Sequence, residues 1–301
     1  VVELAAGEHT ALVEIQKTHK NITRMEKDGV SLLEQTATPE EVVQKTGNRE
    51  LLTVENIIEF ADEVKIEEIE PILSPQIECN MAICREGLEN PYGAEVGRIL
   101  LDGNDHPTVG LKARAYAAAG SDARMNGCPM PVVINSGSGN QGITVSVPVV
   151  IYAQEWNVGR EKLLRALVVA NLTAVHQKNY IGSLSAYCGA TAAGCGAGAG
   201  VCYLHGGRYK EIAHTIVNAV AIDSGMICDG AKASCVAKIA SAVEAGLLGW
   251  KMQQHHSQFY GGDGIVVKGV ENTIRNVGTL ASEGMRETDR TIIRLMTSGM
   301  C

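Results

Sequence analysis

Residues 181–204, IGSLSAYCGATAAGCGAGAGVCYL, are the most informative part of this chain for its architecture. It carries no charged residue and approaches the length of about 20 apolar residues that a membrane-spanning helix needs. Most of its residues are Gly and Ala, which contribute little transfer energy and allow helices to approach each other closely. The stretch therefore predicts a helix over 182–204 that packs closely around a cofactor in a compact core, and we do not expect it to span a membrane.

Helical patterns also dominate the sequence beyond Gly110. Apolar positions recur there with a helical period over many segments. The remaining predicted helices cover residues 111–125, 139–154, 160–177, 210–222, 231–246 and 269–300, the last with a break near Gly284. This part of the chain is expected to form a large all-helical domain.

The front of the chain has a different pattern. Its first 15 residues alternate as strand, turn and strand around Gly7. Thr53 and then Ser74-Pro75 mark the starts of two helices. The predicted fold class is therefore α+β, in which a small N-terminal strand and helix portion precedes the helical domain.

The main domain boundary is expected near residue 105. Residues 89–93 and 102–107 are the connections richest in helix breakers, so they separate domains at 1–105 and 106–301. The chain opens at Val1 without an initiator Met, directly in the first strand. Because a domain rarely begins inside a hairpin, we expect these residues to continue a longer polypeptide or to pair with a separate chain.

The composition narrows the function classes. The 301 residues are 45% hydrophobic and 20% charged, which is enough to bury a large core. A net charge of −8 and a pI near 5.5 disfavour nonspecific binding to nucleic acid or to anionic lipid. Nine cysteines without a secretory leader argue against a disulfide framework. We expect a cytoplasmic protein that binds neither nucleic acid nor membrane.

Three cysteines in the second half of the chain form a candidate metal site. Cys188, Cys228 and Cys235 stand at predicted loops or helix ends, and none of them belongs to a close CxxC pair. Three thiolates can hold an iron–sulfur cluster and leave one iron free for substrate. Cys195 and Cys202 follow Cys188 at intervals of seven, and buried thiols of this kind are commonly core residues.

A structural zinc site is an alternative for the same thiols. It would combine them with a histidine, His205 or His214, in a closed tetrahedral arrangement. Such sites usually contain tight CxxC knuckles, which this sequence lacks.

A loop rich in Gly, Ser and Asn precedes one of the predicted helices. It covers residues 135–143, with the sequence NSGSGNQGI, and a second segment, SDARMNG, lies upstream at 121–127. Backbone N–H groups at the start of a helix suit a carboxylate or a phosphate. A capped surface loop is the alternative, because neither segment matches a Walker A or a GxGxxG pattern.

Taken together, five segments make the chain resemble a known family of lyases. They are residues 121–125 (SDARM), 135–144 (NSGSGNQGIT), 183–188 (SLSAYC), 225–231 (GMICDGA) and 288–293 (TDRTII). With these segments the chain resembles the L-cysteine desulfidase family, which is related to the iron–sulfur L-serine dehydratases through their catalytic part. The short spacer between Cys228 and Cys235 favours the desulfidase branch of this resemblance.

The resemblance implies an activity, a cofactor and a set of site residues. The activity is α,β-elimination of L-cysteine to hydrogen sulfide, ammonia and pyruvate, carried out by the helical domain with a [4Fe-4S] cluster. The implied cluster ligands are Cys188, Cys228 and Cys235. The residues expected to hold the substrate carboxylate are Arg124, Ser136, Gly137, Ser138, Gly139, Asn140 and Gln141.

The resemblance also leaves alternatives open. An L-serine dehydratase-type lyase and a non-catalytic or structural metal-binding partner subunit are the other candidates. The family's N-terminal motif Gly-Cys-Thr-Glu-Pro is absent from these residues, so the catalytic base is unassigned and is a candidate for a preceding segment. We expect a homo-oligomer or association with such a segment. Cys301 at the chain end is a further candidate to reach the free iron.

Overall fold

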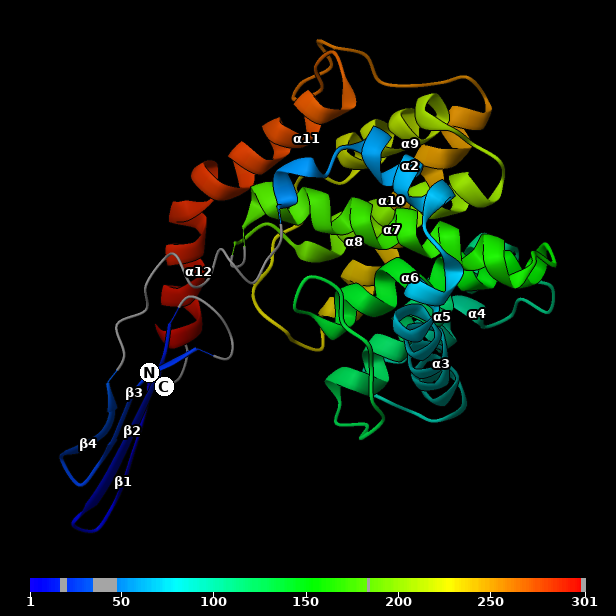
Figure 1. Cartoon of the computed structure of the whole chain (residues 1–301). Helices are drawn as coiled ribbons and strands as arrows, with labels where there is room; N and C mark the ends of the chain where they lie inside the picture. The colour runs from blue at the N-terminus through cyan, green and yellow to red at the C-terminus, as the bar shows by residue number, and fades with distance from the viewer. Residues whose placement is uncertain (17–20, 35–47, 183–184, 299–301) are drawn as a thin grey trace. The chain divides into compact units, whose positions relative to one another are not determined.

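The computed structural model describes residues 1–16, 21–34, 48–182 and 185–298. The chain divides into two compact units, Val1–Glu50 and Leu51–Cys301. The first unit is a small sheet, and the second is built from helices (Figure 1). The predicted α+β class is therefore confirmed.

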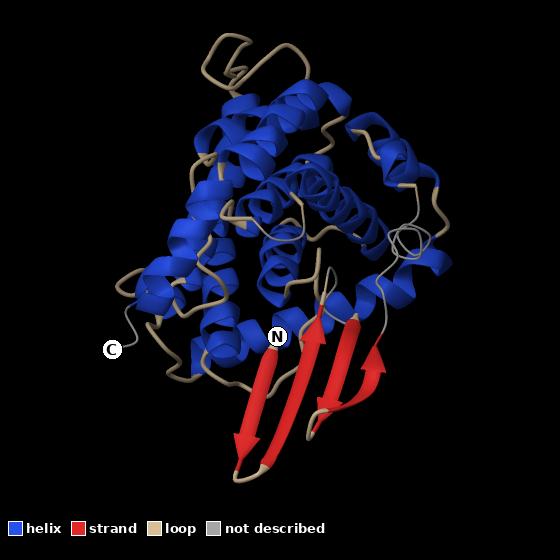
Figure 2. Ribbon diagram, turned by 90° about the vertical axis from the view of Figure 1, so that its left-hand side faces the viewer, coloured by secondary structure: helices blue, strands red, loops and turns tan. Residues whose placement is uncertain are grey.

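Four antiparallel strands form the first unit in the order β1-β2-β3-β4 (Figure 2). They are β1 (Val2–Ala6), β2 (His9–Ile15), β3 (Ile22–Lys27) and β4 (Val30–Glu34). Asp28 and Gly29 have φ of +50° and +75° in the tight turn between β3 and β4, a conformation that Asp-Gly pairs adopt readily. The Asp28 carboxylate also accepts a hydrogen bond from Thr10 N at 2.8 Å. The predicted hairpin at the front of the chain is confirmed.

The helices of the second unit follow the order of the chain. A short 3₁₀ turn, η1 (Arg49–Leu51), is followed by α2 (Val54–Glu63), α3 (Ile66–Glu89), α4 (Val96–Leu101), α5 (Val109–Met125), α6 (Gly139–Glu155), α7 (Arg160–Ile181), α8 (Gly189–Leu204), α9 (Tyr209–Ile222), α10 (Cys235–Gln254), α11 (Val270–Thr279), the π-helical segment η2 (Leu280–Gly284) and α12 (Arg286–Ser298). The helix predicted from the Thr53 cap is confirmed, since Thr53 Oγ1 accepts a hydrogen bond from Asn56 N.

Helix α8 lies at the centre of the second unit, and all of its residues are buried. It packs against α6, α7, α9 and α10 (Figure 1). Its glycines make this packing possible: a Cβ added to Gly194 would lie 2.1 Å from Ala242 O on α10. None of the described helices combines the length and the hydropathy needed to cross a membrane. The small-residue stretch is a core helix, as its composition predicts.

Three helix starts differ from the sequence prediction. Helix α8 begins at Gly189 and not at Gly182, because the chain turns away after α7. Helix α10 begins at Cys235 and not at Ala231. Helix α3 does not start at Ser74-Pro75 but contains Pro71 and Pro75 in its interior.

Packing explains the interior prolines of α3. A proline inside a helix costs about 3 kcal/mol, because it removes a hydrogen bond and crowds the preceding turn. Ile69, Leu73, Met81 and Ile83 of α3 are buried, and α3 packs against α5, α6 and α7. Burying a large apolar side chain contributes about 1.5–3 kcal/mol, so this face outweighs the local cost.

The boundary predicted at residue 105 lies between α4 and α5, inside the second unit. Contacts instead separate the units after Glu50. The assignment of residues 106–301 to a separate catalytic domain stays a prediction.

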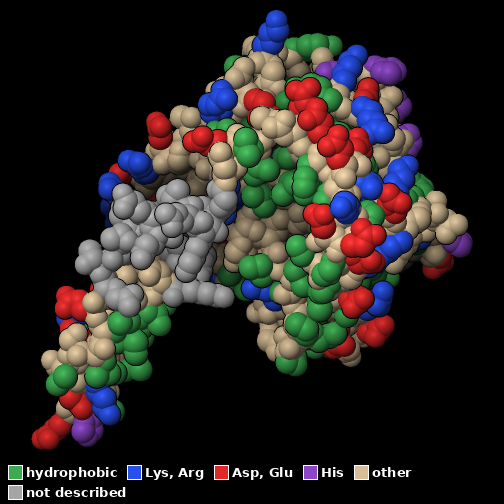
Figure 3. Space-filling model, viewed as in Figure 1, with side chains coloured by type: hydrophobic (Ala, Val, Ile, Leu, Met, Phe, Trp, Pro, Cys, Tyr) green, Lys and Arg blue, Asp and Glu red, His purple; other side chains and the backbone are tan. Residues whose placement is uncertain are grey.

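The face of the molecule shown in Figure 3 mixes acidic and basic side chains, with apolar side chains between them. No broad basic region is visible on this face, in line with the net charge of −8.

Candidate functional site

Two chain segments bring Cys188 and Cys228 together. Cys188 N donates to Met226 O at 3.1 Å, and Cys228 N donates to Ala186 O at 2.6 Å. These bonds flank an antiparallel bridge between Tyr187 and Ile227. Residues two apart on paired strands share one face, so the two cysteines are diagonal neighbours there. Two thiols 40 positions apart in sequence thus meet beside the start of α8.

Cys188 and Cys235 both stand at helix N-termini. Cys188 is the N-cap of α8, and Cys235 is the first residue of α10. The Cys235 sulfur lies 3.5 Å from both Gly230 O and Lys232 N in the loop that carries Cys228. Two of the three cysteines are therefore carried at the N-termini of helices that pack against each other, α8 and α10.

The three thiols influence one another electrostatically. Interaction with the Cys228 thiol, followed by burial and by the charges of Cys228 and Cys235, raises the pKa of Cys188. Interaction with Cys188 lowers the pKa of Cys228 despite burial, with help from Gly230 N–H and the charge of Lys238. The structure therefore places all three cysteines in one neighbourhood.

Lys178 on α7 adds a positive charge to this neighbourhood. Burial lowers the pKa of its amine, and the charges of Cys228 and Cys188 oppose that shift. Lys178 is partly exposed to solvent, and among the described residues its side chain has no hydrogen bond and no ion pair. The charges that act on its amine are those of the Cys228 and Cys188 thiols. The sequence did not single out Lys178, because nothing in the pattern of α7 distinguishes it.

The Ser/Gly/Asn loop forms a tight turn before α6. Asn135 N donates to Ser138 O at 3.1 Å, and Ser138 N donates to Asn135 O at 3.0 Å. Ser136 and Gly137 have φ of +49° and +83°, in the left-handed region. Ser138 is the N-cap of α6, and its Oγ accepts a hydrogen bond from Gln141 N. These hydrogen bonds fix the conformation of the residues that lead into the N-terminus of α6.

Amide side chains from α3 and α7 fasten this loop. Asn80 is fully buried and bonds to both the N–H and the C=O of Val133. The Asn135 side chain donates to Asn171 Oδ1 at 2.8 Å, and Asn171 is itself paired with Gln76. These bonds hold the loop in place against the helical core.

Arg124 reaches the same helix terminus from the last turn of α5. Its Nη1 donates to Asn140 Oδ1 at 3.1 Å. A Cβ on Gly139 would lie 2.4 Å from Arg124 Nε, so only glycine lets the guanidinium lie this close to the first turn of α6. Arg124 makes no ion pair with any described residue. Its charge is available for an anion.

Gln141 connects the loop with the three candidate ligands, Cys188, Cys228 and Cys235. A Cβ on Gly189 would lie 2.4 Å from Gln141 Nε2, so the amide lies directly on the first residue of α8, next to Cys188. Gln141 Oε1 is buried and has no hydrogen-bond partner among the described residues. The predicted anion-binding loop and the predicted cluster ligands therefore meet at the N-terminus of α8.

Other sequence candidates lie elsewhere. The Ser136 hydroxyl donates a hydrogen bond to the side-chain oxygen of its neighbour Asn135 at 2.9 Å. His205 follows the far end of α8, about 26 Å from Cys188 at 1.5 Å per residue, and packs on Trp156 and Trp250. His214 lines a separate cavity. Residues 183–184 and Cys301 lie outside the described residues.

The second unit is thus a helical structure in which three cysteines, two of them at helix N-termini, lie beside a loop suited to a carboxylate. The chain belongs to the serine dehydratase alpha chain family, whose model matches residues 10–294. The relationship to serine dehydratases predicted from the sequence is thereby confirmed.

Relatives of high identity carry the name UPF0597 protein. That of Desulfitobacterium hafniense is 56% identical over 92% of this chain and 64% of its own length. That of Lachnoclostridium phytofermentans is 51% identical over 98% of this chain and 70% of its own length. That of Treponema denticola is 44% identical over 95% of this chain and 68% of its own length. The chain thus spans about two thirds of the length of these relatives. No solved structure matches it significantly.

Proposed function

We propose that this chain is the cluster-binding part of an iron–sulfur-dependent L-cysteine desulfidase. The observation that carries the proposal is the meeting of Cys188 and Cys228, with Cys235 nearby, at the N-terminus of α8 beside Gln141. The family match supports a lyase of the serine dehydratase type. The short spacer between Cys228 and Cys235 supports the cysteine-specific branch.

The residues present fit a [4Fe-4S] cluster with three protein ligands. The three thiols are free, two of them stand at helix N-termini, and Lys178 and Lys238 supply positive charge toward them. Among the described residues, no three His, Cys, Asp or Glu side chains converge around a single ion. In a cubane each thiolate binds a different iron, so a cluster does not require the three sulfurs to surround one point. When bound, the cluster supplies a Lewis-acidic iron that polarises the substrate's leaving group.

The chain's own residues bind and orient the amino acid. Arg124 and the free N–H groups at the start of α6 hold the substrate carboxylate. The unpartnered Gln141 Oε1 accepts a hydrogen bond from the substrate ammonium. Because Gln141 lies against Gly189, this pose directs the β-carbon of the substrate toward the protein's three cysteines. Positioning of this kind accounts for much of the rate of such enzymes.

The reaction balances without an external oxidant or reductant. A base removes the Cα proton, the Cβ–S bond breaks, and hydrogen sulfide and aminoacrylate leave. Aminoacrylate tautomerises and takes up one water to yield pyruvate and ammonia. Elimination of water from L-serine follows the same course, and the family description favours L-serine as the second candidate substrate.

A cytoplasmic location and association with a further chain or segment are parts of this proposal. The family description names an alpha chain, and the relatives extend beyond the matched region. Size-exclusion chromatography coupled to light scattering tests for a homo-oligomer.

Anaerobic reconstitution with iron and sulfide tests the cofactor. We expect about four irons per chain and a broad visible thiolate-to-iron absorption band. Cys228→Ala should lose most of the bound iron. The matched control is Cys202→Ala, which removes a buried thiol from the far half of α8 and should retain the cluster. Full iron content in Cys228→Ala would contradict the ligand assignment.

Parallel assays on L-cysteine and L-serine test the substrate. Sulfide release from L-cysteine without pyruvate formation from L-serine supports the desulfidase. The reverse preference would replace it with a serine dehydratase. Arg124→Met should weaken the substrate-induced change in the cluster spectrum while the iron content stays unchanged.

A further inference from the structure

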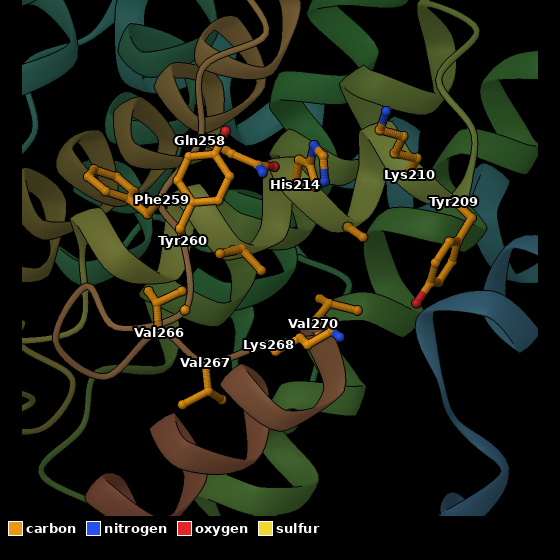
Figure 4. A pocket seen from close by; sticks show the side chains of 14 residues that line it. Tyr209, Lys210, His214, Gln258, Phe259, Tyr260, Val266, Val267, Lys268 and Val270 are labelled. Carbon is orange, nitrogen blue, oxygen red and sulfur yellow. The ribbon is translucent and has the colours of Figure 1, made fainter.

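A cavity of about 510 Å³ lies between α9, the loop over residues 258–269 and the start of α11 (Figure 4). None of its lining residues is one of the three candidate cysteine ligands or belongs to the loop over residues 135–143. Its inner wall is apolar, with buried Ala213, Val217, Val266 and Val270. Ligand sites typically combine such a wall with a few well-placed polar groups.

The charged groups that line this cavity are all basic. They are Lys210 and Lys268, and His214 of α9 also lines the cavity (Figure 4). Neither lysine side chain forms a hydrogen bond or an ion pair with any described residue. In a chain with 34 acidic and 26 basic side chains, a cavity lined only by basic groups is a local reversal of charge. It therefore favours an anionic ligand.

Three acidic side chains that lie close to the lining residues in the sequence accept hydrogen bonds from other groups. The Glu271 carboxylate bonds to His176 Nε2 and to Val54 N, both at 2.7 Å. Asp263 accepts from Tyr260 N within its own turn at 2.6 Å. Glu211 accepts from Arg208 N at 3.0 Å. The acidic groups named here therefore do not neutralise the two lysines by direct pairing.

The N-terminus of α11 opens into the same cavity. Its N-cap, Gly269, lines the cavity and provides no side-chain cap. The N–H groups of the first turn and the positive end of the helix dipole thus add to the charge of Lys268. The N-terminus of α11, Lys268 and Lys210 together give the cavity a positive potential, which suits a ligand group with a charge near −2.

Aromatic side chains line the cavity on two sides, with Phe259 and Tyr260 on one side and Tyr209 on the other (Figure 4). Three of the chain's aromatic residues, Tyr209, Phe259 and Tyr260, line this cavity, although aromatics make up only 4% of the sequence. Tyr209 and Tyr260 are 45% and 62% exposed. Exposed aromatic rings offer flat apolar area to a bound molecule. The ligand should therefore have an aromatic or branched apolar body.

The loop that closes the cavity is held in its shape from behind. Fully buried Asn218 bonds to Phe259 N at 3.0 Å and to Ser257 O at 3.2 Å. Fully buried Thr273 bonds to both the N–H and the C=O of Val267. A pre-formed loop lowers the ordering cost of binding.

We propose that this cavity binds a small organic dianion, such as a phosphate monoester, whose apolar or aromatic body packs on Val217, Phe259 and Tyr260. Lys268 and the N-terminus of α11 hold the charged group, and the exposed Lys210, on the α9 side of the cavity, adds to the positive potential (Figure 4). The site is distinct from the elimination site and does not depend on the cluster.

Isothermal titration calorimetry with phenyl phosphate tests this site, at about pH 7.5, where the probe is mostly a dianion. Inorganic phosphate has the charge but no ring, and phenol has the ring but no charge. Benzoate has the ring and only one negative charge. We expect phenyl phosphate to bind at least about tenfold more tightly than each of them, because each lacks part of the recognition.

A double variant, Lys210→Met with Lys268→Met, keeps the aliphatic stems and removes both charges. It should weaken phenyl phosphate binding about tenfold or more. The matched control is Lys251→Met, an exposed lysine on α10 outside the cavity, which should leave binding unchanged. Equal affinities for all four probes, or unchanged binding in the double variant, would overturn the proposal.

Discussion

At the scale of single residues, Asp223 illustrates how burial changes the chemistry of a side chain. It is the C-cap of α9, and its Oδ2 is buried without a hydrogen-bond partner among the described residues. Burial raises the pKa of this carboxyl from 3.8 to about 6. The negative end of the α9 dipole also disfavours the ionised form of the Asp223 carboxyl. Asp223 follows no sequence motif, so only its position in the fold distinguishes it.

Asp223→Asn should therefore stabilise the protein at neutral and higher pH. Because the folded-state pKa is raised, the contribution of Asp223 to stability is fully present below pH 3.8 and is lost as the pH rises through about 6. After discounting for partial exposure to water, we expect a gain of about 1 kcal/mol at pH 8, or roughly 2–4 °C in Tm.

Thermal unfolding of both proteins at pH 5 and pH 8 checks this expectation. The advantage of the variant should be larger at pH 8. A Tm difference that is the same at both pH values would show that the Asp223 carboxyl does not titrate as described.

At the scale of elements, the crossing of α8 and α10 depends on glycine. A Cβ on Gly194 would lie 2.1 Å from Ala242 O, and a Cβ on Gly246 would lie 2.0 Å from Gly194 O. Both obstacles are backbone atoms, which cannot move aside without separating the helices. Since Cys188 and Cys235 are carried at the N-termini of these two helices, the crossing also sets the distance between two proposed ligands.

Gly194→Ala should destabilise the protein by about 1–3 kcal/mol, the usual cost of overpacking a core. We expect it to reduce the iron content after reconstitution as well, because the helices are forced apart. Gly225→Ala is the control, since a Cβ there meets no atom within 4 Å. Urea unfolding and iron analysis of the two variants make the comparison, and equal stability would contradict the close crossing.

At the scale of the whole molecule, the chain consists of two units, each with its own internal contacts. The sheet unit has few buried side chains, whereas the helical unit contains the core and every residue of both proposed sites. The helical unit should therefore not require the sheet for its stability.

Removal of residues 1–50 should leave the helical unit folded. We expect the Tm of the remainder to stay within about 4 °C of that of the full chain, equivalent to a change of about 1 kcal/mol. Circular dichroism with thermal unfolding measures this, and the iron content shows whether the proposed cluster site is kept. Loss of cooperative unfolding would show that the sheet unit supports the helical core.

Much of the fold could be predicted from local patterns. The N-terminal hairpin, the Thr53 cap and the helices from α5 to α9 follow from periodicity and capping, which depend on near neighbours in the chain. Prediction was wrong for the start of α3, where tertiary packing holds Pro71 and Pro75 inside a helix. It was also wrong for the start of α8, because the loop after α7 is set by its pairing with residues 226–228.

For the candidate site, residue types could be identified from the sequence, but their partners could not. The three cysteines and the loop from Ser136 to Gln141 stand out by spacing and composition, whereas Lys178 and the contact of Gln141 with Gly189 do not. The basic cavity between α9 and α11 also joins segments that are far apart in the chain.

The α+β class, the buried small-residue helix and the family relationship follow from the amino-acid sequence, because local periodicity and composition encode them. The meeting of Cys188 with Cys228, and the position of Gln141 beside them, are visible only in the folded chain. These contacts depend on helix crossings and long-range pairing, whose energies arise only when distant segments pack together.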